Sequence, residues 1–153
     1  MTHKIMVTRF NNKTWDELQE YKTKNELNGS FYGVPRRICA TIPLKCSLIV
    51  LEMNNETNSI MGVGLIKNYI KMDKTYKIYS WGNYHRFTYT GKHNIYRDSF
   101  TREEEVLIRK IEPCLFKGKG HLKRGQGIQK VPYDRYTSKE VGEIMEMFRC
   151  RSI

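Results

Sequence analysis

The stretch Cys46–Met53 constrains the fold more than any other part of the sequence. It reads Cys-Ser-Leu-Ile-Val-Leu-Glu-Met, and the continuous apolar run at Leu48–Leu51 is typical of a strand that is buried on both faces. A second strand is predicted at Ile60–Ile66, after a short polar hairpin loop. Gly62 and Gly64 share one face of this second strand. We interpret them either as a smooth track for another backbone or a flat ligand, or as a bulge.

Further strands and helices are predicted on both sides of this pair. Ile5–Phe10 has the apolar and β-branched composition of a strand. Cap signals and apolar spacing predict three helices: 15–25 after Thr14, a helix after Thr101 that ends at Pro113, and a helix after Thr137. Short strands are also expected near 76–81, 85–90, 94–97 and 114–116, with a hairpin turn at 91–93.

The length of 153 residues suits one domain whose hydrophobic core is large enough to be stable without disulfides or a structural metal. We therefore predict a single α+β domain over 1–153: a curved, mostly antiparallel or mixed β-sheet or barrel, flanked by about three helices. The four cysteines form no Cys-x-x-Cys pair, which favours reduced thiols in an intracellular protein over a zinc site or a disulfide framework. No run approaches the ~20 apolar residues of a membrane span, so none is expected.

Lys117–Pro132 is a basic, glycine-rich segment. It holds four glycines and five Lys or Arg residues, and no acid occurs between Glu112 and Asp134. Because glycine loses the most backbone entropy on ordering, a loop is predicted. Its amides can approach an oxyanion closely while the cations supply positive charge, so phosphate groups are the expected partners. A solvated basic loop is the alternative. A Walker A pattern is absent, so nucleotide hydrolysis has no support.

The charge of the whole chain points to a polyanionic partner. The net charge is +11, which attracts either nucleic acid or an anionic membrane surface. Between Lys67 and Arg97 seven cations accompany one acid, Asp73, and eight aromatic residues lie among them. One aromatic face is expected from core packing alone. A basic strip that also carries aromatics is the composition that binds single-stranded or flipped bases, and Trp81 and Tyr84 are the candidate stacking residues.

The segment Phe31–Arg37 combines two aromatics, a Gly-x-Pro turn and two arginines. Aromatic faces beside guanidinium groups suit a stacked base and its phosphate. An ordinary turn with core aromatics is the alternative interpretation.

Catalysis has little support in the sequence. The spacings His-x-x-His and His-Glu-x-x-His are missing, and a two-metal nuclease would need carboxylates that hold cations ~4 Å apart. His85 and His93 flank the predicted hairpin, and His121 lies apart from both. A metal-free ribonuclease that uses His85 or His121 as general acid and base stays open. We predict no catalytic residue, metal or cofactor.

Residues 31–66 are similar to EVE and related PUA-like domains. The resemblance is carried by Phe31-Tyr32-Gly33-Val34-Pro35-Arg36-Arg37, by the strand at 46–53 and by Ile60-Met61-Gly62-Val63-Gly64-Leu65-Ile66. Pro35 departs from the pattern, because that family tends to have Arg there. The resemblance implies a compact barrel with flanking helices and an aromatic-lined pocket for a flipped or modified base. It places Tyr32, Gly33, Val34 and Arg36 near that pocket, with Trp81 as a stacking wall. The composition also resembles that of small basic proteins of large DNA viruses.

These observations predict a non-catalytic nucleic-acid-binding domain, for DNA or RNA, that reads a flipped or modified base. The first alternative is a structural or assembly protein of a nucleoprotein or virion, with other proteins of the assembly as partners. The second is a metal-independent nuclease. We expect a cytoplasmic or nuclear location, or the virion. The predicted phosphate contacts are Lys117, Lys119, Lys123, Arg124, Lys130, Arg36 and Arg37, and the predicted base pocket is formed by Tyr32, Gly33, Val34, Trp81 and Tyr84.

Overall fold

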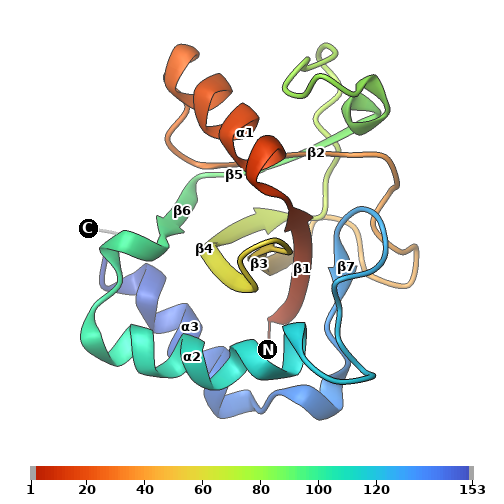
Figure 1. Cartoon of the computed structure of the whole chain (residues 1–153). Coiled ribbons are helices and arrows are strands. Elements are labelled where there is room, and N and C mark those ends of the chain that lie inside the picture. Colours follow the sequence, from red (N-terminus) through yellow and green to blue (C-terminus); the bar gives the residue numbers. More distant parts are fainter. Residues whose placement is uncertain (1–2, 152–153) are drawn as a thin grey trace.

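The computed structural model describes residues 3–151, which form a five-stranded mixed β-sheet with layers on both faces (Figure 1). The strand order is β6-β4-β3-β1-β7. Strands β1 and β3 are parallel, and the other neighbouring pairs are antiparallel. The strands are β1 (Lys4–Phe10), β3 (Ser47–Asn54), β4 (Ser59–Lys67), β6 (His93–Tyr96) and β7 (Gln129–Lys130).

The continuous apolar run of β3 lies at the centre of the sheet, and its side chains supply both faces. Leu48, Ile49, Val50 and Leu51 are all fully buried, which confirms the prediction of a strand covered on both sides. Alternate residues point to opposite faces, so Ile49 and Leu51 belong to one core and Leu48 and Val50 to the other. We name these cores the helix side and the ribbon side.

On the helix side, α2 (Arg102–Phe116) and α3 (Ser138–Arg149) cover the sheet. Both helices begin with capping boxes, Thr101 with Glu104 and Thr137 with Glu140, as the sequence predicted. On α3 Val141, Ile144 and Phe148 are buried against the sheet.

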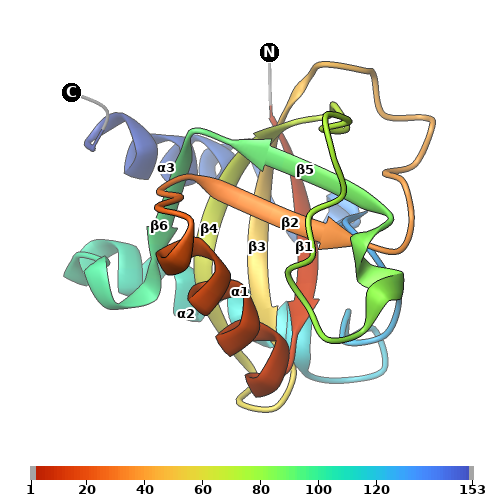
Figure 2. The same cartoon turned by 90° about the horizontal axis from the view of Figure 1, so that it is seen from above.

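On the ribbon side, a separate two-stranded antiparallel ribbon of β2 (Ser30–Val34) and β5 (Phe87–Gly91) crosses the sheet, with α1 (Asn12–Lys24) beside it (Figure 2). Three short 3₁₀ helices complete the described chain: η1 (Gly82–His85), η2 (Arg97–Ser99) and η3 (Tyr133–Arg135). The class α+β, the mixed sheet and the three α-helices were therefore predicted correctly. Within residues 3–151 the strands do not close into a barrel.

The predicted hairpin at 91–93 is wrong. Strand β5 pairs with β2, whereas β6 pairs with β4, so the turn carries the chain from the ribbon to the main sheet. Gly91 makes this possible, because a Cβ there would collide with the backbone of Leu65 in β4. The predicted strand at 76–81 is also absent. Tyr79 is buried while Lys77 and Trp81 are exposed, so these three side chains do not share one face.

Two helix boundaries also differ from the prediction. Helix α1 begins after Asn11, whose side chain caps the amide of Thr14, so Thr14 is the third helical residue and not the cap. Helix α2 continues through Pro113 to Phe116 in place of the short strand expected at 114–116. Proline disfavours a helix interior, but the last turn buries Leu115 and Phe116 in the helix-side core, and that burial opposes the cost.

Candidate nucleic-acid interface

The glycine-rich loop 117–132 is held against the end of β1 by Arg9. The Arg9 Nε donates to the carbonyl of Leu122 at 2.6 Å, and one of its terminal nitrogens donates to Oε1 of Gln129 at 2.9 Å. Burial lowers the pKa of the Arg9 guanidinium to about 10. Asn55 adds a second anchor, because its Nδ2 donates to the carbonyl of Lys123 at 2.8 Å. The loop therefore has a defined position at the β1–β7 edge of the sheet, with Leu122 packed on the helix-side core and Ile128 buried in the ribbon-side core.

Three of the loop glycines adopt backbone conformations that favour glycine. Gly118, Gly125 and Gly127 have φ values of 79°, 118° and 79°, in the region that favours glycine. A Cβ on Gly125 would also collide with the Gln129 side chain that Arg9 holds. The composition that predicted a loop therefore matches both a backbone requirement and a packing requirement.

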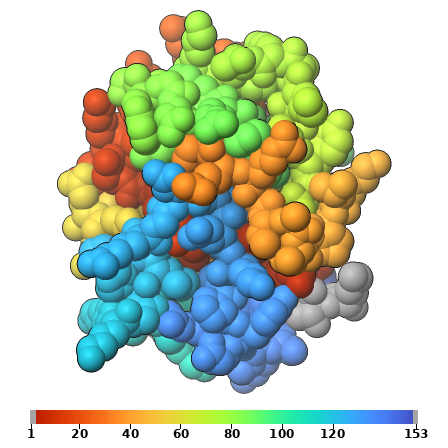
Figure 3. Space-filling view, turned by 90° about the vertical axis from the view of Figure 1, so that its right-hand side faces the viewer, coloured from red at the N-terminus to blue at the C-terminus, as the bar shows by residue number. Residues whose placement is uncertain are grey.

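A cavity of about 300 Å³ lies between this loop, the end of β1 and the end of the ribbon. Five stretches that are distant in sequence converge on it. Its lining residues are Thr8, Arg9, Phe10, Asn11, Thr14, Tyr32, Gly33, Val34, Pro35, Asn55, Tyr79, Tyr84, Lys123, Gly125, Gln126 and Gly127. In Figure 3 loop residues (blue) meet residues of the thirties (orange) and eighties (green), with β1 (red) visible between them. We call this space the loop cavity.

The structure brings five of the predicted site residues to the loop cavity. Tyr32, Gly33, Val34, Tyr84 and Lys123 line it. Of the remaining predicted residues, Arg36 lies at the rim and donates from Nε to Oε1 of Gln126 at 3.2 Å.

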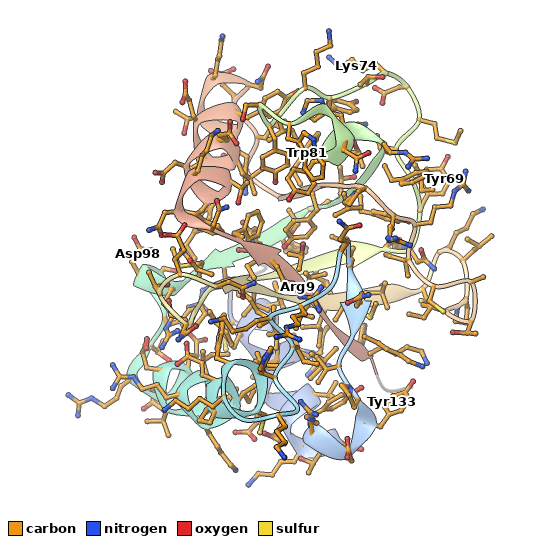
Figure 4. All side chains as sticks on the ribbon, turned by 45° about the vertical axis from the view of Figure 1, so that its right-hand side comes forward. Arg9, Tyr69, Lys74, Trp81, Asp98 and Tyr133 are labelled. Atoms are coloured by element: carbon orange, nitrogen blue, oxygen red, sulfur yellow. The ribbon has the colours of Figure 1, made fainter. Side chains whose placement is uncertain are left out.

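The other predicted residues lie outside the lining. Trp81 is 52% exposed and meets Tyr84 edge-on, with ring centroids 4.7 Å apart. The Arg37 guanidinium lies 5.0 Å from the centroid of the Phe87 ring. Lys117, Lys119, Arg124 and Lys130 are exposed on the surface. Figure 4 shows Arg9 beneath the loop and Trp81 near η1.

The cations around this site have no acidic partners. Within residues 3–151, none of the seven predicted phosphate contacts has a carboxylate oxygen within 4.0 Å. The described lining of the loop cavity likewise includes no Asp or Glu. Five of the six ion pairs in this part of the chain involve α2 or α3. Positive charge at the site is therefore available to a partner.

Behind Tyr32 lies a buried polar cluster that the sequence did not predict. The Tyr32 hydroxyl donates to the Glu52 carboxylate, and Asn94 Nδ2 donates to the same Oε2 at 2.9 Å. Lys22 Nζ donates to Asn94 Oδ1 at 2.9 Å and lies 4.9 Å from the centroid of the Tyr96 ring. Burial raises the pKa of Glu52, and it lowers the pKa of Lys22. The cluster fixes the orientation of Tyr32 at the wall of the cavity.

Gly62 and Gly64 make room for this cluster. A Cβ on Gly62 would lie 2.6 Å from Oε1 of Glu52, and one on Gly64 would collide with the Tyr32 hydroxyl. The space above the two glycines is therefore occupied by side chains of this chain, and no open track for an external ligand remains there. The alternative interpretation, a bulge, is confirmed beside Gly62, because Glu52 pairs with Gly62 whereas Met53 pairs with Ile60.

Two residues of the site, Arg9 and Asn55, escaped sequence analysis. An arginine between Thr8 and Phe10 in a buried strand was the available signal for Arg9, since a buried cation needs partners. Asn55 sits in the polar turn after β3, where asparagine is common, so its composition carried no signal. Its Oδ1 is buried and has no hydrogen-bond partner among the described residues, although the residue lines the cavity.

The histidines do not assemble a reactive centre in this cavity. His85 Nε2 accepts from the amide of Tyr79 at 2.9 Å, and His121 Nδ1 accepts from the amide of Lys123 at 3.2 Å. Neither histidine lines the loop cavity. Residues 3–151 contain no group of three or more His, Cys, Asp or Glu side chains placed to hold a metal ion.

Comparisons with models of protein families, with curated proteins and with solved structures found no match to this chain. No helix in the described part of the chain is both long enough and apolar enough to cross a membrane.

Proposed function

We propose that this protein is a non-catalytic nucleic-acid-binding domain whose loop cavity holds an unstacked base. The observation that carries the proposal is the convergence of three predicted segments on one acid-free cavity: the turn at 31–37, the aromatic strip and the glycine-rich loop. A volume of about 300 Å³ lies at the small end of ligand pockets, which favours a compact flat ligand over an extended one.

The chemistry of the lining supports a base with its phosphate. Tyr84 and Tyr79 offer aromatic surface, and the buried Asn55 Oδ1 is an acceptor that an N–H on a base edge would satisfy. Lys123, which lines the cavity, and the adjoining exposed Arg124 would contact a backbone phosphate of the same nucleotide. Trp81, edge-on to Tyr84, adds a stacking surface just outside the cavity.

The resemblance to EVE and PUA-like domains is part of this proposal. It implies a flipped or modified base near Tyr32, Gly33 and Val34, and these three residues line the loop cavity. A flipped base needs a snug pocket that reads its edge, whereas a purely electrostatic binder needs none.

Fluorescence anisotropy with labelled single- and double-stranded DNA and RNA, at two salt concentrations, tests the proposal. We expect submicromolar binding that weakens with salt, with a slope of roughly 0.7–0.9 per phosphate contact. The Lys123→Glu/Arg124→Glu variant should lose most of this binding. The Lys110→Glu/Lys139→Glu variant changes the net charge equally on exposed positions of α2 and α3 and should bind nearly as well. Equal loss in both variants, or no binding by folded protein, would refute the proposal.

An assembly protein with a basic surface is the second candidate, and the unpaired cations favour it equally. Trp81→Ala separates the two, because base stacking is worth ~1–3 kcal/mol per base and a purely electrostatic contact would not need the ring. Cleavage of labelled RNA in the presence of a chelator would instead favour the metal-independent nuclease.

A further inference from the structure

A second cavity lies at the opposite end of the β2–β5 ribbon. It is an open recess of about 640 Å³ between the ends of β4 and β5 and the start of β6. Three exposed lysines, Lys45, Lys67 and Lys92, contribute to its wall, together with Tyr69, which is 61% exposed. Its described lining contains no carboxylate. We call it the lysine cavity, and it repeats the combination of cations and aromatic surface found at the loop cavity.

The ribbon sets the spacing of the two cavities. Val34, paired with Phe87, lies at the loop cavity, and Gly91, paired with Ser30, lies at the lysine cavity. Four residue steps along a strand separate these pairs, which is about 13 Å. A stretched polymer of a few units could therefore reach both.

The chain itself runs from one cavity to the other. The segment between β4 and η1 crosses over the ribbon (Figure 2), with Tyr69 at the lysine cavity and Tyr79 at the loop cavity. Its exposed side chains include Lys74, Lys77 and Trp81. Tyr69, Lys74 and Trp81 lie on the same part of the molecule in Figure 4.

Two carboxylates lie at this path, Asp73 within the segment and Glu17 of α1, which accepts from the amide of Ser80 at 2.9 Å. Asp73 is neutralised locally. Both carboxylate oxygens of Asp73 accept from the Tyr76 hydroxyl, at 2.5 and 2.6 Å, and Lys71 Nζ lies 3.9 Å away. The path between the cavities is thus a basic surface with aromatic side chains, which is the composition of single-strand binding surfaces.

We propose that the lysine cavity is a second contact site for the same single-stranded nucleic acid, which runs along residues 69–81 between the two cavities. This inference rests on the proposed function. A single strand fits better than a duplex, because both contact points are recessed, each has an exposed aromatic side chain (Trp81 beside the loop cavity, Tyr69 at the lysine cavity), and a looped surface joins them. An anionic membrane would reach the lysines at the rim but would leave the recess unfilled.

A length series of labelled oligonucleotides tests the inference on the full chain. Lengths from about 4 to about 16 nucleotides cover the usual site sizes of such surfaces. Wild-type affinity should rise steeply once the strand reaches both cavities, because the second contact becomes intramolecular and gains about tenfold or more.

The variants separate the two sites. Lys67→Glu/Lys92→Glu should leave the shortest oligonucleotides bound normally and should lose about tenfold or more on the longest. Lys123→Glu/Arg124→Glu should weaken binding at every length, and Lys110→Glu/Lys139→Glu should match the wild type. Circular dichroism confirms that each variant is folded.

The remaining outcomes refute either the second site alone or both proposals. If Lys67→Glu/Lys92→Glu behaves like the control at all lengths, the second site is refuted while the loop cavity keeps its support. If vesicles containing phosphatidylserine bind the wild type but not this variant, and oligonucleotides bind both equally, the lysine cavity serves a membrane surface and the inference is wrong. If no oligonucleotide binds at low salt, both proposals fail together.

Discussion

The two faces of the central sheet differ in how their charged side chains are paired. On the helix side, Arg97 contacts Glu105 and Glu112 at 2.8 Å, and Arg151 contacts Glu104 at 2.6 Å. The predicted phosphate contacts, in the glycine-rich loop and after β2, have no carboxylate within 4.0 Å in residues 3–151. The acid that is buried on the ribbon side, Glu52, is held by hydroxyl and amide donors. The first arrangement stabilises the fold by itself. The second leaves cations at the surface that have no carboxylate partner among the described residues.

The largest expected effect comes from breaking the helix-side network. Arg97 also donates to the carbonyl of Ile60 at 2.8 Å, so it joins β4, η2 and α2. Arg97→Met should leave Glu112 without its cation and Glu105 with only the more distant Arg109, at 3.6 Å. It should lower the free energy of unfolding by about 3 kcal/mol, the low end for breaking a buried ion pair. Urea denaturation measures it. A loss below about 1 kcal/mol would mean that these pairs act as ordinary surface salt bridges.

On the ribbon side, the matching test is Gly64→Ala. The new methyl group would meet the Tyr32 hydroxyl and would lie 2.5 Å from Oγ of Ser30, so overpacking should cost about 1–3 kcal/mol. The same substitution at Gly142, which has open space on the surface of α3, should stabilise the protein by up to about 1 kcal/mol. If both variants are equally stable, the cluster behind Tyr32 can yield to a methyl group, and it does not position that ring.

The two faces should also respond to pH in opposite directions. Glu104 and Glu105 have lowered pKa values because of Arg151 and Arg97, so their contribution is present above about pH 4.5 and is lost as the pH falls through their folded-state pKa values. Burial raises the pKa of Glu52, so its contribution is complete below about pH 4.5 and is lost as the pH rises through its folded-state pKa.

Unfolding free energies of Glu52→Gln and Glu105→Gln from pH 3 to pH 8 test this opposition. Relative to the wild type, Glu52→Gln should gain stability as the pH rises above 4.5, and Glu105→Gln should gain it as the pH falls below 4.5. Each slope is limited to about 1.4 kcal/mol per pH unit for one proton. Slopes of the same sign would show that the two carboxyl groups have similar surroundings.

Local sequence signals predicted the secondary structure better than they predicted tertiary partners. The strands around Leu48–Leu51 and Ile60–Ile66 and the caps at Thr101 and Thr137 follow from patterns within a few residues, and they were correct. The hairpin at 91–93 failed because Gly91 approaches the backbone of β4, a contact between distant segments. The end at Pro113 failed because burial of the following turn outweighs a local preference.

The same holds for the candidate site: single residues could be predicted from the sequence, but their assembly into one cavity could not. Composition alone pointed to Lys123, Tyr84 and the turn at Tyr32, but nothing in it said that they meet at one cavity. Arg9 and Asn55 hold that cavity together by contacts across more than sixty positions of the chain, and Trp81 stays outside it. Such long-range contacts depend on the whole fold.

The smallest expected effect is on stability, from reversing the cations of the loop. The side chains of Lys123 and Arg124 have no carboxylate within 4.0 Å, and Arg9 and Asn55 anchor the loop through its backbone carbonyls, which a substitution leaves in place. Lys123→Glu/Arg124→Glu should therefore change the unfolding free energy by no more than about 0.5 kcal/mol, as is usual for surface positions. Thermal unfolding followed by circular dichroism measures this on the same samples that are used for nucleic-acid titration. A variant that keeps its stability and loses binding would show that these charges serve a partner, whereas a loss above about 1 kcal/mol would mean that the loop cations support the fold and that the contrast between the two faces is weaker than their ion pairs indicate.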